Sequence, residues 1–139
     1  MSTVEKVAAH IAIADLVHGY ALAVRRDRPE DVEALFVPTG TFEVRDGAPD
    51  RDDAISRGVF ENPQALVAFL LSTKGKPHPV PMIHNLMIDV QGDVATASSL
   101  MVGPILGTDH HVFGEYDDSF VQVAGQWRFS SRVFTLFRS

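Results

Sequence analysis

The clearest structural signal in this chain lies in residues 110–138, which read HHVFGEYDDSFVQV (110–123), AGQ (124–126) and WRFSSRVFTLFR (127–138). Two runs rich in aromatic and β-branched residues flank a polar break, a pattern that predicts an antiparallel β-hairpin. Because successive strand residues point to opposite faces, one face carries His110, Val112, Gly114, Tyr116, Asp118 and Phe120 from the first strand, and Trp127, Phe129, Ser131, Val133 and Phe137 share a face on the second. A tyrosine and two ionisable groups among apolar residues indicate the wall of a pocket.

The composition is that of a water-soluble globular protein, and we expect residues 1–139 to form a single domain. The net charge of −6 argues against a nucleic-acid partner, because phosphate binding needs a basic face. No apolar run approaches the length of a membrane span, and no signal peptide is recognisable. With no cysteine, disulfides and thiol catalysis are excluded. We therefore expect a cytoplasmic protein without a membrane partner.

Patterns in the remaining sequence predict three helices and three further strands. Apolar residues at spacings of three and four predict a helix from Ser2 to about Arg25, with Tyr20 on its apolar stripe. Shorter helices are expected at 29–36 and 62–71, a short strand at 41–45, a loop at 46–58, and strands at 80–90 and 94–106. The order predicts an α+β domain, with helices packed on one face of a curved antiparallel or mixed β-sheet.

These elements resemble the nuclear transport factor 2-like superfamily, and within it the SnoaL-like branch of polyketide cyclases and scytalone dehydratases. The resemblance rests on Tyr20-Ala21, on ALF (34–36) followed by GTF (40–42), on Asn85 leading to GDVA (92–95), and on GEYDD (114–118) followed by GQWRF (125–129) and Arg132. It covers nearly the whole chain. It implies a cone-shaped α+β barrel with a deep apolar pocket between the concave face of the sheet and the helices, commonly in a homodimer.

The chain departs from this family where its best-known members carry their acids and bases. Many members have an aspartate five positions after the helix tyrosine, where this chain has Arg25. Dehydratase-like members often have a histidine three positions before the strand asparagine, where this chain has Met82. The general-base aspartate of ketosteroid isomerase-like members falls at Val44. The chemistry must therefore be sought in other residues.

His84 is the first candidate for a catalytic acid or base. The alternation of 80–90 places it on one face with Met82, Leu86 and Ile88, unless a one-residue bulge reverses the phase. A histidine exchanges a proton near neutral pH, although a buried structural histidine fits the pattern equally well. Tyr20 and Tyr116 are candidates to hold a carbonyl or enolate oxygen; the alternative for Tyr20 is core packing.

The expected pocket walls also include Phe36, Phe42, Met82, Met101, His110 and Asp118. For Asp118 we favour a structural salt bridge with Arg132 or Arg128 across the hairpin, and for His110 a solvated strand start. The pair His110-His111 is no metal site, because adjacent strand residues point to opposite faces. No nucleotide-binding or metalloenzyme motif is present, so any enzyme here is expected to need no metal or other cofactor.

Two functional hypotheses follow. The first is a cofactor-independent acid/base enzyme, of cyclase, isomerase or dehydratase type, that acts on a small apolar carbonyl compound such as a polyketide- or steroid-like molecule. The second is a non-catalytic module on the same fold that binds a small hydrophobic ligand or serves in assembly. Convergence of His84 and a second ionisable group on one pocket would favour the enzyme.

Overall fold

The computed structural model describes residues 1–137, so Arg138 of the predicted hairpin lies outside the described residues. The helices are α1 (Thr3–Arg25), two 3-10 helices (Pro29–Asp31 and Glu33–Leu35) and α2 (Pro63–Ser72). The strands are β1 (Phe36–Gly47), β2 (Ile55–Phe60), β3 (Met82–Gln91), β4 (Val94–Pro104), β5 (His111–Val123) and β6 (Gln126–Phe137). They form one sheet in the order β2-β1-β6-β5-β4-β3. The predicted α+β architecture is confirmed.

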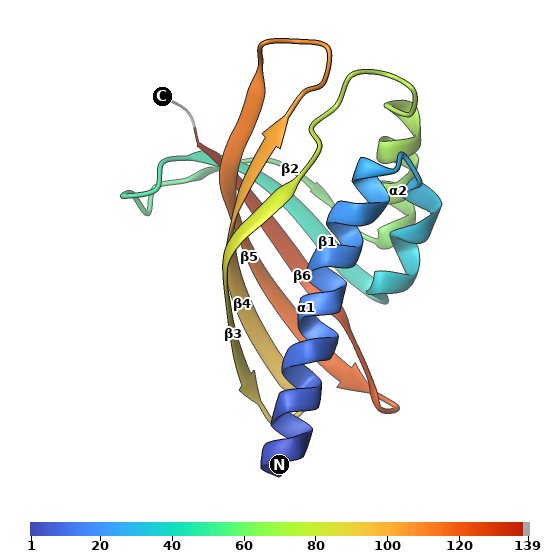
Figure 1. The fold of residues 1–139 in the computed structure, drawn as a ribbon, viewed down its shortest axis with the longest axis vertical. Coiled ribbons are helices and arrows are strands. Elements are labelled where there is room, and N and C mark those ends of the chain that lie inside the picture. Colours follow the sequence, from blue (N-terminus) through green and yellow to red (C-terminus); the bar gives the residue numbers. More distant parts are fainter. Residues whose placement is uncertain (138–139) are drawn as a thin grey trace.

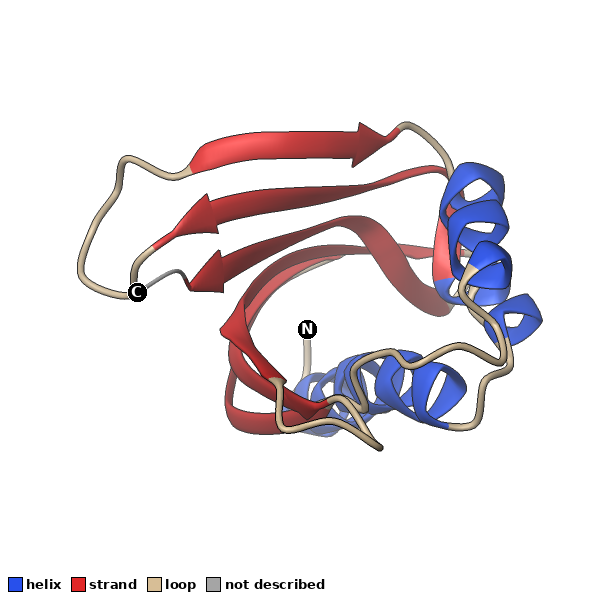
Figure 2. Cartoon of the chain, turned by 90° about the horizontal axis from the view of Figure 1, so that it is seen from above, coloured by secondary structure: helices blue, strands red, loops and turns tan. Residues whose placement is uncertain are grey.

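The sheet curls around α1, which lies along its concave face (Figures 1 and 2). The pairing of β1 with β6 is parallel and every other pairing is antiparallel, so the sheet is mixed. The helix α2 and the 3-10 helices lie at one end of α1, on the side of β1 and β2 (Figure 1). The concave face, α1 and α2 therefore enclose the core.

The predicted start of α1 is confirmed by a capping box, in which the Glu5 amide donates to Ser2 Oγ at 3.1 Å and the Ser2 amide to Glu5 Oε1 at 3.4 Å. One face of the helix is buried through Ala9, Ile13, Val17 and Tyr20. By length and composition alone, the helix could also cross a membrane, which differs from the expectation that no apolar run approaches that length. A core helix meets the same criterion, and the buried face of α1 packs in the core.

The strand boundaries differ from the predictions near β1 and β2. The predicted loop at 46–58 is shorter, because β1 extends to Gly47 and β2 starts at Ile55. The predicted helix at 29–36 is a pair of 3-10 turns, after which β1 begins at Phe36. The four-stranded run from β3 to β6 is confirmed.

Two irregularities in strand pairing change which residues face the core. Between β5 and β6, Ser119 pairs with Ser131 but Phe120 pairs with Phe129, so Ser130 is an extra residue in β6. Beyond it Arg132, Phe134 and Leu136 take the inner positions, and the expected inner positions of Ser131, Val133 and Phe137 are wrong. In β3 the register shifts between His84 and Met87, around Asn85 with φ 52°.

Gly114, at the start of the GEYDD motif, is required by close packing. A Cβ at this position would lie 2.3 Å from the Thr135 carbonyl oxygen and 2.6 Å from the Phe134 ring. Both neighbours belong to β6, the paired strand. The glycine lets the Phe134 ring lie directly over β5.

We expect Gly114→Ala to lower the free energy of unfolding by about 2–3 kcal/mol, because the new methyl group overpacks the hairpin. Urea denaturation followed by circular dichroism measures the change. Gly58→Ala is the matched strand control, since a Cβ there meets nothing within 4 Å. Equal stability of the two variants would contradict this account of Gly114.

Candidate functional site

An apolar cavity of about 320 Å³ lies between α1, α2 and the concave face of the sheet. Its aromatic and aliphatic walls include Phe42, Val44, Phe60, Leu66, Phe69, Leu70, Met101, Val112 and Phe134. Its polar side chains are Tyr20, Asp27, Thr73, His78 and Tyr116. The volume is that of a site for a small organic molecule.

Four of the predicted site residues line this cavity: Tyr20, Tyr116, Phe42 and Met101. Phe36 is buried outside the lining, where its ring stacks on Phe129 with a centroid distance of 4.9 Å. Met82 and His110 are exposed, so their expected place in the pocket wall is wrong. Asp118 is buried but lies outside the lining.

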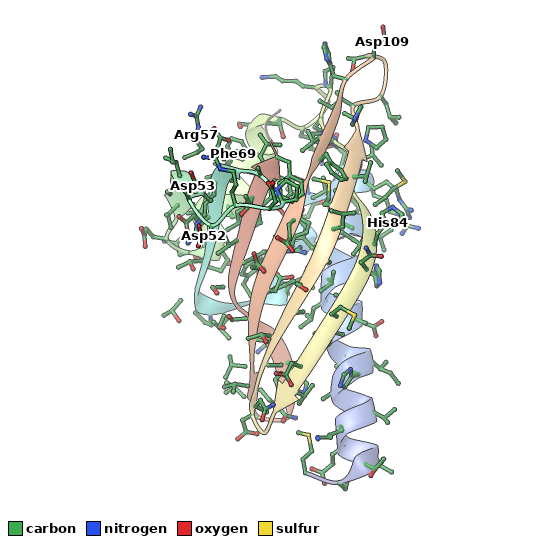
Figure 3. All side chains as sticks on the ribbon, turned by 90° about the vertical axis from the view of Figure 1, so that its left-hand side faces the viewer. Asp52, Asp53, Arg57, Phe69, His84 and Asp109 are labelled. Carbon is green, nitrogen blue, oxygen red and sulfur yellow. The ribbon has the colours of Figure 1, made fainter. Side chains whose placement is uncertain are left out.

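The expected position of His84 in the pocket is also wrong. Figure 3 shows its side chain projecting from the edge strand β3, and the residue is exposed. The cause is the irregularity around Asn85, whose left-handed backbone breaks the alternation. After the bulge, the inward-facing residues are Leu86, Ile88 and Val90, as predicted. Before the bulge, Met82 and His84 were expected on the same face, but both are exposed.

A histidine that the sequence analysis did not single out, His78, lies in the cavity lining beside Asp27. Its Nε2 is 3.4 Å from Asp27 Oδ1, and its Nδ1 is 3.0 Å from the carbonyl oxygen of Pro79. A carbonyl oxygen only accepts hydrogen bonds, so Nδ1 carries a proton. The side chains of His78 and Asp27 are 19% and 32% exposed, which places the pair at the open end of the cavity.

Local structure fixes both members of this pair. Asp27 follows the end of α1 in a Schellman motif, with Arg28 N–H donating to Ala23 O at 2.9 Å and Asp27 N–H to Val24 O at 3.1 Å. The Gly75 amide donates to Asp27 Oδ2 at 2.8 Å, which leaves Oδ1 facing His78. On the other side, Val80 N–H donates to Pro104 O at 2.9 Å, so the segment that carries His78 is held against β4.

Asp27 has a φ of 56°, a conformation that glycine normally supplies at this place in a Schellman motif. A non-glycine residue held there is strained, and strain of this kind gathers at functional sites. An acidic residue directly after the first predicted helix is a signal that the sequence carries. His78 gave a weaker signal, because the segment 73–79 has no periodicity.

The model of the SnoaL-like domain family matches residues 5–133. The chain belongs to the SnoaL-like family. None of the curated proteins compared with it matches. The match spans nearly all the elements that build the cavity, so the resemblance inferred from the sequence motifs is confirmed.

Solved structures share the fold of this SnoaL-like protein. A proposed β subunit of an aromatic-ring-hydroxylating dioxygenase from Novosphingobium aromaticivorans has a TM-score of 0.79 at 24% identity, over 98% of this chain and 93% of its own. A proposed scytalone dehydratase from the same organism has a TM-score of 0.71 at 23% identity, over 97% and 88%. A hexachlorocyclohexane dehydrochlorinase has a TM-score of 0.73 at 14% identity, over 97% and 89%.

Beneath the cavity, the SnoaL-like chain buries an ion pair that the sequence analysis favoured for Asp118. Arg132 Nε donates to Asp118 Oδ1 at 3.0 Å, and both side chains are fully buried. The guanidinium carbon lies 3.5 Å from the centre of the Tyr116 ring and 4.6 Å from that of Tyr20. Burial raises the pKa of Asp118 to about 6, against the opposing effect of Arg132. At neutral pH the carboxylate is therefore charged and paired.

The two tyrosines at this inner end remain protonated donors. Burial raises the pKa of Tyr20 and of Tyr116 above the ordinary value for a phenol. Neither hydroxyl has a hydrogen-bond partner within residues 1–137. The fully buried side-chain atoms without a partner in that region are Ser99 Oγ and Arg132 Nη1, so both tyrosine hydroxyl oxygens keep some accessible surface. Because both tyrosines are buried residues of the cavity lining, this surface faces the cavity.

We expect Asp27→Ala to be less stable than Asp27→Gly by about 1 kcal/mol, because both lose the carboxylate but only alanine keeps the left-handed strain. Chemical denaturation of the two variants gives the difference directly. Both variants lose the hydrogen bond from the Gly75 amide, so this loss cancels when their stabilities are compared. Equal stabilities would show that the Asp27 backbone is not strained.

We expect Asp118→Asn to lower the free energy of unfolding by about 3 kcal/mol, since it leaves the charge of Arg132 buried without its counter-ion. The neighbouring residue Asp117 is exposed and faces the other side of β5, so Asp117→Asn is the matched control. Urea denaturation at neutral pH compares them. A loss below about 0.5 kcal/mol for Asp118→Asn would contradict the role assigned to the pair.

Proposed function

We propose that this SnoaL-like protein is a cofactor-independent acid/base enzyme that eliminates water, or a comparable small leaving group, from a small apolar carbonyl compound. The observation that carries the proposal is the His78–Asp27 pair at the open end of an apolar cavity whose inner end holds two unpartnered tyrosine hydroxyls. A substrate in this cavity therefore meets a proton acceptor at one end and, at the other, hydroxyl groups that can donate hydrogen bonds to an oxyanion.

The base in this proposal is His78 Nε2. With its proton on Nδ1, the neutral ring presents the lone pair of Nε2 to Asp27 Oδ1, and the two acceptors lie 3.4 Å apart. A proton that arrives between them is bound by the nitrogen and stabilised by the carboxylate. When the ring takes up a proton at Nε2, Asp27 Oδ1 faces it as an ion-pair partner.

The reaction removes a proton from the carbon next to the carbonyl group, and the electron pair of that C–H bond forms an enolate. Tyr20 and Tyr116 donate hydrogen bonds to the developing oxyanion. The bond from the β-carbon to the leaving oxygen then breaks as the enolate collapses to a conjugated carbonyl. His78 returns its proton to the leaving hydroxide, which departs as water, so that the enzyme ends in its starting state.

The compared structures support the class of reaction without fixing it. A dehydratase and a dehydrochlorinase are both named for eliminations, and both share this fold. Cyclisation or isomerisation of a polyketide- or steroid-like compound would start with the same proton removal. We keep the predictions of a small hydrophobic ligand, a homodimer and a cytoplasmic location as parts of the proposal.

We expect His78→Ala to lower kcat/KM about 10²–10⁴-fold on cyclic β-hydroxyketones, because it removes the base. The rise in ultraviolet absorbance of the conjugated product measures the rate. His84→Ala is the matched control and should keep the full rate, since His84 is exposed and outside the cavity.

An equal loss in the two histidine variants would contradict the assignment of the base. If the wild-type protein binds members of the panel but turns none over above the buffer rate, the alternative of a non-catalytic binding module replaces the proposal. Binding is followed by the fluorescence of Trp127, the single tryptophan of the chain.

A further inference from the structure

Arg132 is a full positive charge buried directly behind the tyrosines of the cavity. It is 0% exposed, and its Nη1 is one of two fully buried polar side-chain atoms without a partner in the described chain. The proposed reaction assigns it no step. If it only filled space, an apolar side chain of similar volume would do so without burying a charge and an unpartnered N–H group.

The position of Arg132 connects its charge to the cavity through two aromatic rings. Its guanidinium carbon lies 3.5 Å from the ring centre of Tyr116 and 4.6 Å from that of Tyr20, within the range of a cation–π contact. The ring centres of the two tyrosines are 6.3 Å apart. One cation therefore acts on both phenols at once.

A cation against a phenol ring stabilises negative charge on the oxygen and makes the hydroxyl a stronger donor. Arg132 lowers the pKa of both tyrosines, although burial is the larger effect and keeps both pKa values raised. Asp118 acts in the opposite direction on each phenol. The balance between Arg132 and Asp118 thus sets the electrostatic potential at the inner end of the cavity.

We infer that Arg132 is a positioning residue that acts through Tyr20 and Tyr116 to make the inner end of the cavity a binding site for an oxyanion, such as an enolate or a phenolate. The inference deepens the proposed function and rests on it for the identity of the enolate. The charged and titratable groups around the site are Arg132 and Asp118 beneath it, and Asp27 and His78 at the open end.

The test uses 4-nitrophenol, whose absorbance distinguishes the neutral phenol from the phenolate, bound to wild-type protein and to variants across a pH series. Removal of the cation in Arg132→Met should raise the pKa of the bound dye by about half a pH unit or more. Removal of the counter-ion in Asp118→Asn should lower it by a similar amount. Asp117→Asn, on the exposed face of β5, should leave it unchanged.

The opposite signs separate this role from a structural one. Both variants disturb the same ion pair, so a loss of packing alone would shift the pKa of the bound dye in the same direction in both variants. Shifts of equal sign, or no shift, overturn the inference, as does failure of the wild-type protein to bind the phenolate. If Arg132→Met does not fold, Tyr116→Phe takes its place and should also raise the pKa of the bound dye.

The dye experiment is independent of turnover. If β-hydroxyketones are converted but the dye shows no opposed shifts, the inference about Arg132 fails and the His78–Asp27 base stands. If the opposed shifts are found but no substrate of the panel reacts, the oxyanion site stands and the proposed elimination fails.

Discussion

Arg132 and Asp118 form an ion pair in which both side chains are fully buried. An isolated charge in such a place would be strongly destabilising, so each residue requires the other. They come from neighbouring strands and pair directly across the β5–β6 hairpin. The rings of Tyr20 and Tyr116 pack over this pair, so the position of the inner end of the cavity depends on the register of one hairpin.

That register depends in turn on single residues that the alternation of a sequence does not reveal. The sequence predicted the hairpin, the place of Tyr20 and Tyr116 in the pocket wall, and a salt bridge of Asp118 with either Arg132 or Arg128. These follow from strong local patterns and from opposite charges on neighbouring strands. It did not predict the extra residue at Ser130, which brings Arg132 to the core side. A bulge changes the face of every residue beyond it while leaving the composition of the strand unchanged.

The histidines show the same limit. His84 lies in a regular apolar run, yet the backbone of Asn85 turns it to solvent. His78 lies in a segment without periodicity, and its position comes from contacts distant in sequence: the bond from Val80 to Pro104, and the packing of Pro79 over Gly103, where a Cβ would lie 3.0 Å from Pro79. Long-range contacts of this kind set the site, whereas local patterns set the elements that carry it.

The parallel pairing of β1 with β6 has a consequence for how the protein is made. These strands are separated by most of the chain, yet β6 lies in the middle of the sheet between β1 and β5. During synthesis, all the other described elements leave the ribosome before the strand that joins the two halves of the sheet. Until then, the edges of β1 and β5 that pair with β6 have no partner strand, so contact with a chaperone is most useful at this stage of synthesis.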